Sequence, residues 1–369
     1  MPTPMLTPTL TPMPTQTDIR ALLDKLGTRT MTPPPVVTHP DFMINFAVWQ
    51  WHQGVALHGL YQAGKVLGGE RHRRFITDWI AARLGEGTPA KSINTTAPLL
   101  TMAFLHEENP NPVYEKHCRE FAAWCMKNAP RLPDGTYEHS CTENVYPRQV
   151  WADTLFMGGY FLAKWGRVTG DDTLVDEAAR QFLNHYHHLH DARTRLIFHG
   201  YDDLREKHIG VLWGRGNGWY AMATAEVLAL LGKQHPAHAA MLADLRAQLA
   251  GAAATQDASG GWRTVMDDAS SYLEATCTAA FACAFLRAAG LGYVDDGYRA
   301  RAARALEQLE AWTNDSGDLT HSSAGTPIKP DAAGYNAIPF AVTTFSQGLG
   351  LLAFAQALKS GKQQMTFAP

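Results

Sequence analysis

Two kinds of helical segment alternate along this chain, and this alternation constrains the fold more than any other feature. From about Asp18 onward apolar residues recur every three or four residues, and no convincing stretch has the period of two that marks a strand. Six segments are rich in glycine, alanine and aromatic residues and carry few charges, as in FMGGYFLAKW. The six segments that alternate with them carry more charge, as in YRARAARALEQLEAW.

A helix that is apolar nearly all round is buried, whereas an amphipathic helix faces water. The alternation therefore predicts an all-α (α/α)6 toroid in a single domain, with six inner helices inside six outer ones. The predicted helices cover, in chain order, residues 18–27, 43–65, 70–85, 95–107, 112–128, 148–168, 172–190, 216–232, 236–255, 270–288, 294–313 and 338–359. The loops that enter or leave the inner helices surround one mouth of a central cavity, where we expect the functional site.

The first residues, MPTPMLTPTLTPMPT, repeat proline and threonine and lack the basic and apolar regions of a secretion signal. Because proline at this density cannot continue a helix, we expect a disordered leader over residues 1–16 and one catalytic domain over residues 17–369. The five cysteines show no CxxC spacing. Together these features predict a cytoplasmic protein.

Charge and hydropathy argue against two classes of partner. The chain has 32 Lys and Arg against 35 Asp and Glu, a formal net charge of −3, so it lacks the basic composition of a nucleic-acid-binding protein. It has no run of 18 apolar residues that could span a membrane. The chain instead is rich in rings, with 10 Trp, 12 Tyr, 15 Phe and 16 His, which suit a pocket that stacks a polar ring. We expect the protein to be a monomer or a small homo-oligomer.

The segment WGRGNGW, residues 213–219, precedes an inner helix and combines three alternating glycines with Trp213, Arg215 and Trp219. Glycine lets the backbone approach a ligand closely, while the other three supply stacking faces and a fixed cation. The segment is not a phosphate loop, because it lacks GK[ST]. We interpret it as part of a ligand pocket, with a tight turn and core tryptophans as the alternative.

Asp153 lies in the first turns of a strongly apolar helix, beside Trp151. Among aromatic rings the pKa of an aspartate can rise enough for it to donate a proton near neutral pH, although simple capping or salt bridging is the alternative. His139 and His199 each lie in a loop before an inner helix, so we expect both at the same mouth as Asp153 and Arg215.

The histidines at positions 185, 187, 188 and 190 end an outer, amphipathic helix. Because no carboxylate or cysteine completes a zinc pattern beside them, we expect no metal site, and we expect no cofactor.

Five further segments, together with WGRGNGW, resemble a known enzyme family, and the resemblance covers most of the chain after the leader. They are WHQGVALHGLY at 51–61, WADTLFMGGYFL at 151–162, QDASGGWRTVMDD at 256–268, SSYLEATCTAAFACAF at 270–285 and GYNAIPFAVTTFSQGLGLLAFA at 334–355. Together they resemble the unsaturated rhamnogalacturonyl hydrolases of glycoside hydrolase family 105, which are related to the unsaturated glucuronyl hydrolases of family 88. The fold of these families is an (α/α)6 barrel, in agreement with the helix pattern.

The resemblance implies removal of a Δ4,5-unsaturated uronic acid from the nonreducing end of oligosaccharides made by polysaccharide lyases. A general acid, matched by Asp153, protonates C4 of the vinyl ether, and water adds to C5. The resulting hemiketal opens and rearranges, which releases the rest of the sugar. The resemblance implies that the sugar is bound by Trp51, His139, Trp151, His199, Trp213, Arg215 and Trp219.

One position departs from the family pattern. The family usually has a second aspartate at the start of the second inner helix, where KSINTTAPLL places Asn94 in this chain. An amide can orient a sugar hydroxyl or the attacking water, but it cannot titrate. We therefore expect Asn94 to contact substrate or water and to influence substrate preference or activity.

Three other functions stay open from the sequence. A sugar epimerase would use His139 and His199 as its acid and base. A conventional glycosidase would pair Asp153 with a second carboxylate, from Asp202 or Asp203. A non-catalytic carbohydrate-binding protein would explain Asn94 as the mark of a degenerate site.

Overall fold

The computed structural model describes residues 15–35, 39–142 and 144–366, with side chains described as far as residue 361. The first fourteen residues of the predicted leader lie outside this range. Thr15 already caps the first helix, because its side chain accepts a hydrogen bond from the backbone N–H of Asp18 at 3.3 Å. The helix begins at Gln16, one residue before the predicted domain boundary.

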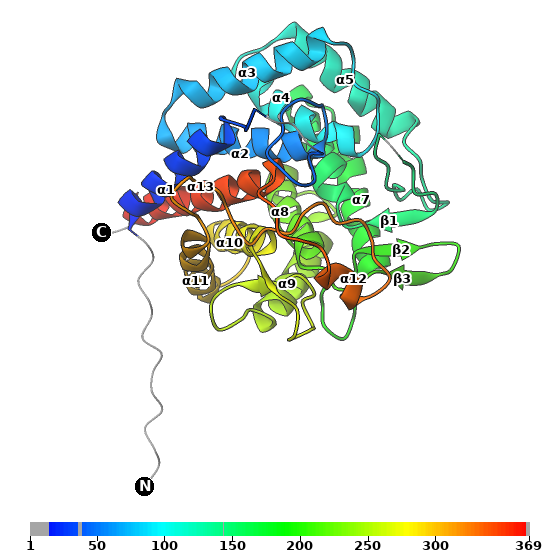
Figure 1. The fold of residues 1–369 in the computed structure, drawn as a ribbon. Helices are drawn as coiled ribbons and strands as arrows, with labels where there is room; N and C mark the ends of the chain where they lie inside the picture. Colours follow the sequence, from blue (N-terminus) through cyan, green and yellow to red (C-terminus); the bar gives the residue numbers. More distant parts are fainter. Residues whose placement is uncertain (1–14, 36–38, 143, 367–369) are drawn as a thin grey trace.

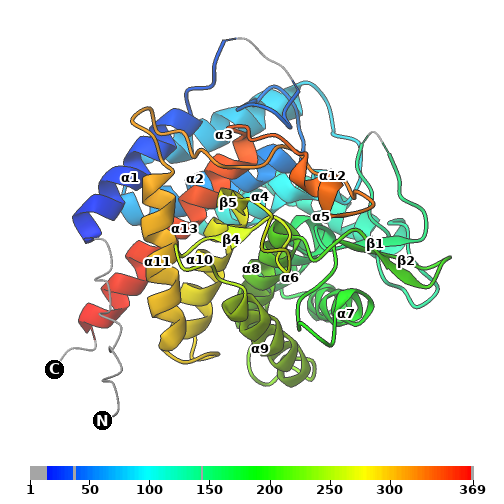
Figure 2. The same ribbon diagram turned by 60° about the horizontal axis from the view of Figure 1, so that its bottom comes forward.

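In the described part of the chain, twelve long helices are arranged as an inner and an outer ring of six each. Figures 1 and 2 show the arrangement from two directions. The inner helices are α2 (Trp51–Leu67), α4 (Ala97–Glu108), α6 (Tyr160–Thr169), α8 (Gly214–Leu231), α10 (Ala275–Gly290) and α13 (Thr344–Thr366). The outer helices are α1 (Gln16–Thr30), α3 (Glu70–Gly85), α5 (Pro112–Lys127), α7 (Asp172–Leu189), α9 (His238–Ala254) and α11 (Gly297–Ala311). Each inner helix packs on the next, and α13 closes the ring against α2. The predicted (α/α)6 toroid is confirmed.

Burial explains the two rings. Nearly every residue of α8 and α10 is buried, because these helices have neighbours on all sides, whereas α3 buries only four residues along one face. Local signals end the helices. Gly68 and Gly170 adopt left-handed conformations, with φ of 79° and 68°, at the ends of α2 and α6. Asn111 and Asp171 cap the starts of α5 and α7 with their side chains.

Short strands and irregular turns replace part of two predicted helices. The predicted helix at 148–168 begins as strand β1 (Gln149–Trp151) and a π-helical turn, η2 (Leu155–Gly159), before α6. The predicted helix at 270–288 begins as β5 (Leu273–Glu274), which pairs with β4 (Trp262–Arg263). Two or three residues are too few to reveal a period of two, so the sequence did not indicate these strands.

A three-stranded antiparallel sheet covers one side of the barrel mouth. It has the order β1–β2–β3, with β2 at Gly200–Asp202 and β3 at Lys207–Ile209, and its register pairs Trp151 with Gly200. The short helix α12 (Ala332–Asn336), which was not predicted, lies close to this sheet in both views (Figures 1 and 2).

All six inner helices begin at the same end of the barrel, because each outer helix returns the chain to its starting end. The positive ends of six helix dipoles therefore surround one mouth, which favours anionic ligands there. Among the described residues, no helix is both long and apolar enough to cross a membrane.

Candidate active site

A cavity of about 270 Å³ lies at the end where the inner helices begin. Five of the predicted site residues line it: Trp51, Asn94, His139, Trp151 and Asp153. They come from the start of α2, from the turn before α4, from the loop before β1, from β1 itself and from the residues that follow it. His199, Trp213, Arg215 and Trp219 lie behind the walls of the cavity, where their exposure is 0–2%.

Asp153 lies between β1 and η2, in the irregular segment that replaces the start of the predicted helix at 148–168. Its carboxylate lines the cavity from there. Its Oδ2 lies 3.4 Å from Nε2 of His199, and its side chain is 15% exposed. The β1–β2 pairing sets this distance, because Ala152 donates its backbone N–H to the carbonyl of His199 at 2.9 Å.

Aromatic stacking fixes the two histidines beside Asp153. The ring of His139 stacks on Trp151 with centroids 4.6 Å apart, and its Nδ1 lies 3.0 Å from the Thr154 hydroxyl. The ring of His199 stacks on Trp213 at 4.0 Å, and its Nδ1 lies 2.6 Å from the Tyr335 hydroxyl. Because each Nδ1 has a partner, Nε2 of His199 is the nitrogen left to face Asp153.

The electrostatics of the free site differ from the expectation of a raised pKa. Burial raises the pKa of Asp153, but the contact with His199 and the charges of His199, His139 and Arg215 outweigh burial and hold the pKa below its ordinary value. Burial also lowers the pKa of His139 to about 4 and lowers the pKa of His199. In the free site at neutral pH Asp153 is therefore a carboxylate between two neutral imidazoles.

The segment WGRGNGW forms the start of α8 and packs against neighbouring elements. A Cβ on Gly218 would come within 2.5 Å of Ala280 Cβ, and one on Gly214 within 2.5 Å of the carbonyl oxygen of Arg263. These glycines therefore permit close packing of α8 against α10 and β4, whereas the sequence analysis assigned them to close approach of a ligand.

Arg215 also differs from the expectation that it contacts a ligand. Its guanidinium is 1% exposed, lies between the rings of Trp213 and Phe345, and donates to the carbonyl oxygens of Ser323 and Ala324 at 2.9 Å each. It also donates to the Thr326 hydroxyl at 2.8 Å. The geometry thus gives Arg215 two roles: it anchors the segment 323–326, which reaches the cavity at Gly325, and it places a positive charge behind the cavity wall.

Asn94 begins the 3-10 turn η1 (Asn94–Thr96) at the start of α4. Its backbone N–H donates to the carbonyl of Ser140 at 3.1 Å, and its side chain is held at the cavity wall with 8% exposure. Its buried Oδ1 accepts no hydrogen bond from any described residue. An unused acceptor at this place suits a sugar hydroxyl or a water molecule.

A second carboxylate, that of Asp41, lines the cavity and was not predicted from the sequence. Its Oδ1 lies 2.7 Å from Nε2 of the buried His52. Burial raises the pKa of Asp41, but the hydrogen bond and charge of His52 outweigh it and lower the pKa. His52 follows Trp51 in the motif WHQG, so the motif marked this wall, whereas nothing in the pattern around Asp41 indicated its position.

Other residues considered from the sequence lie outside the cavity. Asp203 forms an ion pair with Arg148, and Asp202 lines an adjoining cavity. His188 lies 2.7 Å from Asp134 on the outer face of α7. In the part of the chain that the structure describes, no group of three or more His, Cys, Asp or Glu residues is arranged to hold a metal ion.

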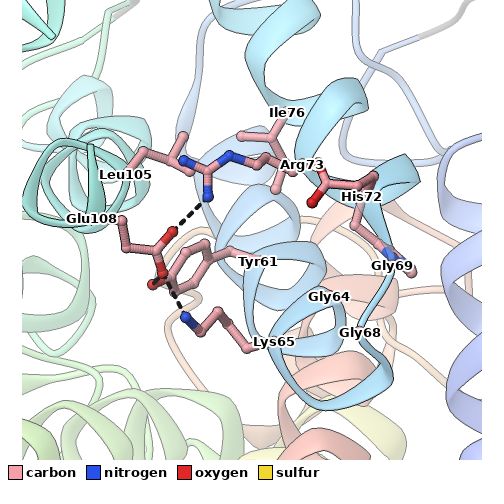
Figure 3. Close-up of a pocket in the computed structure, with 11 residues that line it drawn as sticks. Tyr61, Gly64, Lys65, Gly68, Gly69, His72, Arg73, Ile76, Leu105 and Glu108 are labelled. Carbon is pink, nitrogen blue, oxygen red and sulfur yellow. Dashed lines mark hydrogen bonds and ion pairs between the residues drawn. The ribbon is translucent and has the colours of Figure 1, made fainter. Parts of the chain in front are cut away.

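A cavity of about 280 Å³ lies at the opposite end of the barrel, where α2 and α4 end and α3 begins. Figure 3 shows Glu108 between Lys65 and Arg73, at 2.8 and 2.6 Å, and Tyr61 donates to it at 2.6 Å. Because these charges pair with one another, the cluster ties helix ends together. The cavity at Asp153 is the better candidate for chemistry.

Comparison with known proteins identifies the family of this chain. The model of Glycosyl Hydrolase Family 88 matches residues 22–360. The chain is 33% identical over 326 residues to the unsaturated rhamnogalacturonyl hydrolase YesR of Bacillus subtilis, which covers 87% of this chain and 93% of YesR. The crystal structure of a possible member of family GH105 from Salmonella enterica superposes with a TM-score of 0.89 at 32% identity, over 97% of this chain and 99% of that one.

A more distant structure shares the fold alone. The unsaturated glucuronyl hydrolase of Bacillus sp. GL1 superposes with a TM-score of 0.73 at 15% identity, over 92% of this chain and 96% of that one. The matches confirm the resemblance carried by the motifs: the chain belongs to glycosyl hydrolase family 88, a family of glycosidases, and is similar to proteins grouped in family 105.

Proposed function

We propose that this protein removes a Δ4,5-unsaturated uronic acid from the nonreducing end of lyase-generated oligosaccharides by hydration of the C4=C5 double bond. The observation that carries the proposal is Asp153, a nearly buried carboxylate in an aromatic-walled cavity at the mouth of the barrel. The name of its relative YesR, an unsaturated rhamnogalacturonyl hydrolase, supports the same substrate class.

Binding of the substrate converts Asp153 to its protonated form, which can donate a proton. A uronate carboxylate bound beside Asp153 brings a second negative charge and displaces water, and both effects raise the pKa of Asp153. This rise must outweigh the contact with His199 and the charges of His199, His139 and Arg215, which lower the pKa of Asp153 in the free site. Asp153 then takes up a proton as the anionic sugar binds.

The reaction follows from that protonated state. Asp153 donates its proton to C4, and the π electrons of the double bond form the new C–H bond. The cation left at C5 and the ring oxygen is stabilised by the new carboxylate of Asp153. Water adds to C5 and returns a proton to the site. The hemiketal then opens to a ketone at C5, and the hemiacetal left at C1 expels the rest of the oligosaccharide as an alcohol.

The other walls bind and orient the sugar. Trp51 and Trp151 supply flat faces, and the free Oδ1 of Asn94 positions a hydroxyl or the attacking water. The positive ends of the inner helices attract the uronate carboxylate, and the charge of Arg215 behind the wall adds less, because the buried carboxylate of Glu274 lies 3.9 Å from it. His199 holds Asp153 in place from behind the wall, and His139, which lines the cavity, completes the binding surface.

The direct test follows the ultraviolet absorbance of the C4=C5 bond in lyase-generated oligosaccharides. We expect the protein to bleach this band, and Asp153→Asn to reduce the rate by several orders of magnitude while thermal unfolding and substrate binding stay close to wild type. Asp172→Asn, an exposed change on α7, is the matched control. An Asp153→Asn variant with near-full activity would refute the role of Asp153.

The same assay separates two of the alternatives from the proposed function, and the position of an oxygen label separates the third. An epimerase or a binding protein leaves the absorbance band intact. A conventional two-carboxylate glycosidase is the second candidate, favoured by one observation: Asp41 lines the cavity together with Asp153. Asp202 and Asp203, the second acids considered from the sequence, do not line it.

We also propose a cytoplasmic location. All five cysteines are free, and Cys118, Cys125 and Cys277 are buried as thiols, which suits a reducing compartment. Cell fractionation with antibody detection tests this proposal, and recovery of the protein outside the cytoplasmic fraction would contradict it.

A further inference from the structure

A second cavity, of about 460 Å³, adjoins the candidate active site. The two cavities share Tyr146, Trp151 and Pro327 as common lining. The cavity at Asp153 is small for a ligand pocket, for which roughly 300–1,000 Å³ is typical. An oligosaccharide therefore needs further space, and the adjoining cavity provides it on the far side of the shared wall.

The adjoining cavity has basic walls. Arg205 and Lys207 come from the β2–β3 hairpin, and Lys329 comes from the segment before α12, while Asp202 is the one carboxylate among its lining residues. Asp202 lies 3.4 Å from Arg205. Neither Lys207 nor Lys329 forms an ion pair with any residue in the described part of the chain. Two cations are thus left unpaired at one place in a chain whose net charge is −3.

His208 does not add to this charge. Its Nε2 lies 3.0 Å from the backbone carbonyl of His188, and its ring stacks on Phe198 with centroids 4.3 Å apart. Burial lowers its pKa, so the ring is neutral at neutral pH. The positive charge of the cavity therefore comes from the two lysines and Arg205.

The shared wall suits a sugar chain that passes from one cavity to the other. Trp151 and Tyr146 contact each other with ring centroids 4.3 Å apart, and Nε1 of Trp151 donates to Oε1 of Gln149 at 3.0 Å. Gln149 belongs to β1, so the strand fixes the indole at the boundary. Trp151 is 6% exposed, so only its edge is open to a sugar ring at this boundary, and the half-buried Tyr146 offers more surface for packing.

We propose that the adjoining cavity binds a second anionic group, a carboxylate or a sulfate ester, carried by a sugar beyond the bond that is cleaved. Lys207 and Lys329 are the residues that recognise this group. The inference rests on the proposed function, and it narrows the substrate class to oligosaccharides that carry acidic groups on both sides of the cleaved bond. Ammonium groups act as point charges, so carboxylate and sulfate are both suitable ligands.

The test compares three oligosaccharides of equal length that share the same unsaturated uronate. The leaving part of the first is neutral, that of the second carries a carboxylate, and that of the third carries a sulfate ester. Rates are measured by loss of the double-bond absorbance for wild type, for Lys207→Gln with Lys329→Gln, and for the control Lys127→Gln at the end of α5. Circular dichroism and thermal unfolding establish that the variants are folded.

We expect wild type and the control to prefer at least one acidic substrate, through a lower KM. The double variant should raise the KM for that substrate about tenfold and leave kcat nearly constant, because two charge-assisted contacts are lost in binding. The preferred acidic substrate identifies the group as carboxylate or sulfate. Higher salt should weaken the preference, since it screens exposed charges.

Two results would overturn the inference in distinguishable ways. Bleaching of all three substrates with equal KM values, or a preference that the double variant retains, would refute the acidic subsite and leave the proposed function standing. Failure to bleach any of the three substrates would refute the proposed function, and the subsite would fall with it.

Discussion

The protonation of Asp153 depends on the residues that surround it in space more than on its neighbours in the sequence. The sequence predicted a carboxylate among aromatic rings, and the structure adds that His199 lies 3.4 Å away and that both neighbouring imidazoles are buried. The direction of its pKa shift could not be predicted, because it depends chiefly on the contact with His199, which is distant in the sequence. Asp41 escaped notice because a loop position carries no periodic pattern, whereas its partner His52 lies in the motif WHQG at the start of α2.

Substitution of Asn94 tests whether the amide contacts the reacting sugar or water. Asn94→Ala should lower kcat/KM by about threefold to a hundredfold, because one or two hydrogen bonds of roughly 0.5–1.5 kcal/mol each are lost. Asn94→Asp should add a second ionisation to the pH dependence of kcat/KM, which Asn cannot supply. Steady-state kinetics across pH checks both variants. If rate, KM and pH profile stay unchanged in both, Asn94 lies outside the site.

At the scale of helices and strands, the alternation of apolar and charged segments was enough to predict every member of both rings. Four helix starts were predicted too early: α2, α6, α10 and α13 begin at residues 51, 160, 275 and 344, whereas the predicted starts were 43, 148, 270 and 338. The glycines of WGRGNGW show a second limit. A glycine that permits helix packing and a glycine that permits ligand approach look alike in a sequence, and only the distance to Ala280 separates the two explanations.

The packing of α8 on α10 predicts the effect of a single added methyl group. Gly218→Ala should destabilise the protein by about 1–3 kcal/mol, because the new Cβ would lie 2.5 Å from Ala280 Cβ in a fully buried interface. Gly85→Ala is the control, since its Cβ meets no atom within 4 Å and should change stability by no more than about 1 kcal/mol, in the favourable direction. Urea unfolding measures both. Equal stabilities for the two variants would contradict this packing.

The whole molecule is a closed ring in which the first and last inner helices, α2 and α13, pack together. Closure buries polar groups along the barrel as well as apolar ones. His58 is 3% exposed, and burial, aided by the charges of Lys359 and Lys164, lowers its pKa to about 3. The sequence marked His58 only as one residue of the motif WHQGVALHGLY, because its surroundings come from several helices.

The burial of the neutral His58 ring predicts that the folded protein loses stability in acid. Below pH 6.5 the unfolded chain protonates His58 while the folded protein does not, so the free energy of unfolding falls as pH falls from 6.5 towards 3. Between pH 7 and pH 5 this one group should cost about 2 kcal/mol. His58→Gln should reduce the stability difference between these pH values by that amount, whereas His187→Gln, at an exposed position on α7, should not. Equal pH differences for wild type and His58→Gln, measured by urea unfolding, would contradict it.

Hydration of the double bond is tested most directly by the position of an oxygen label. The reaction is run in ¹⁸O-labelled water and quenched early with borohydride, which converts the carbonyl groups to alcohols before they exchange with water. If water adds to C5, the released uronate carries the heavy oxygen at C5, while C1 keeps the former ring oxygen. Heavy oxygen at C1 would mean ordinary cleavage of the glycosidic bond and would contradict the hydration route.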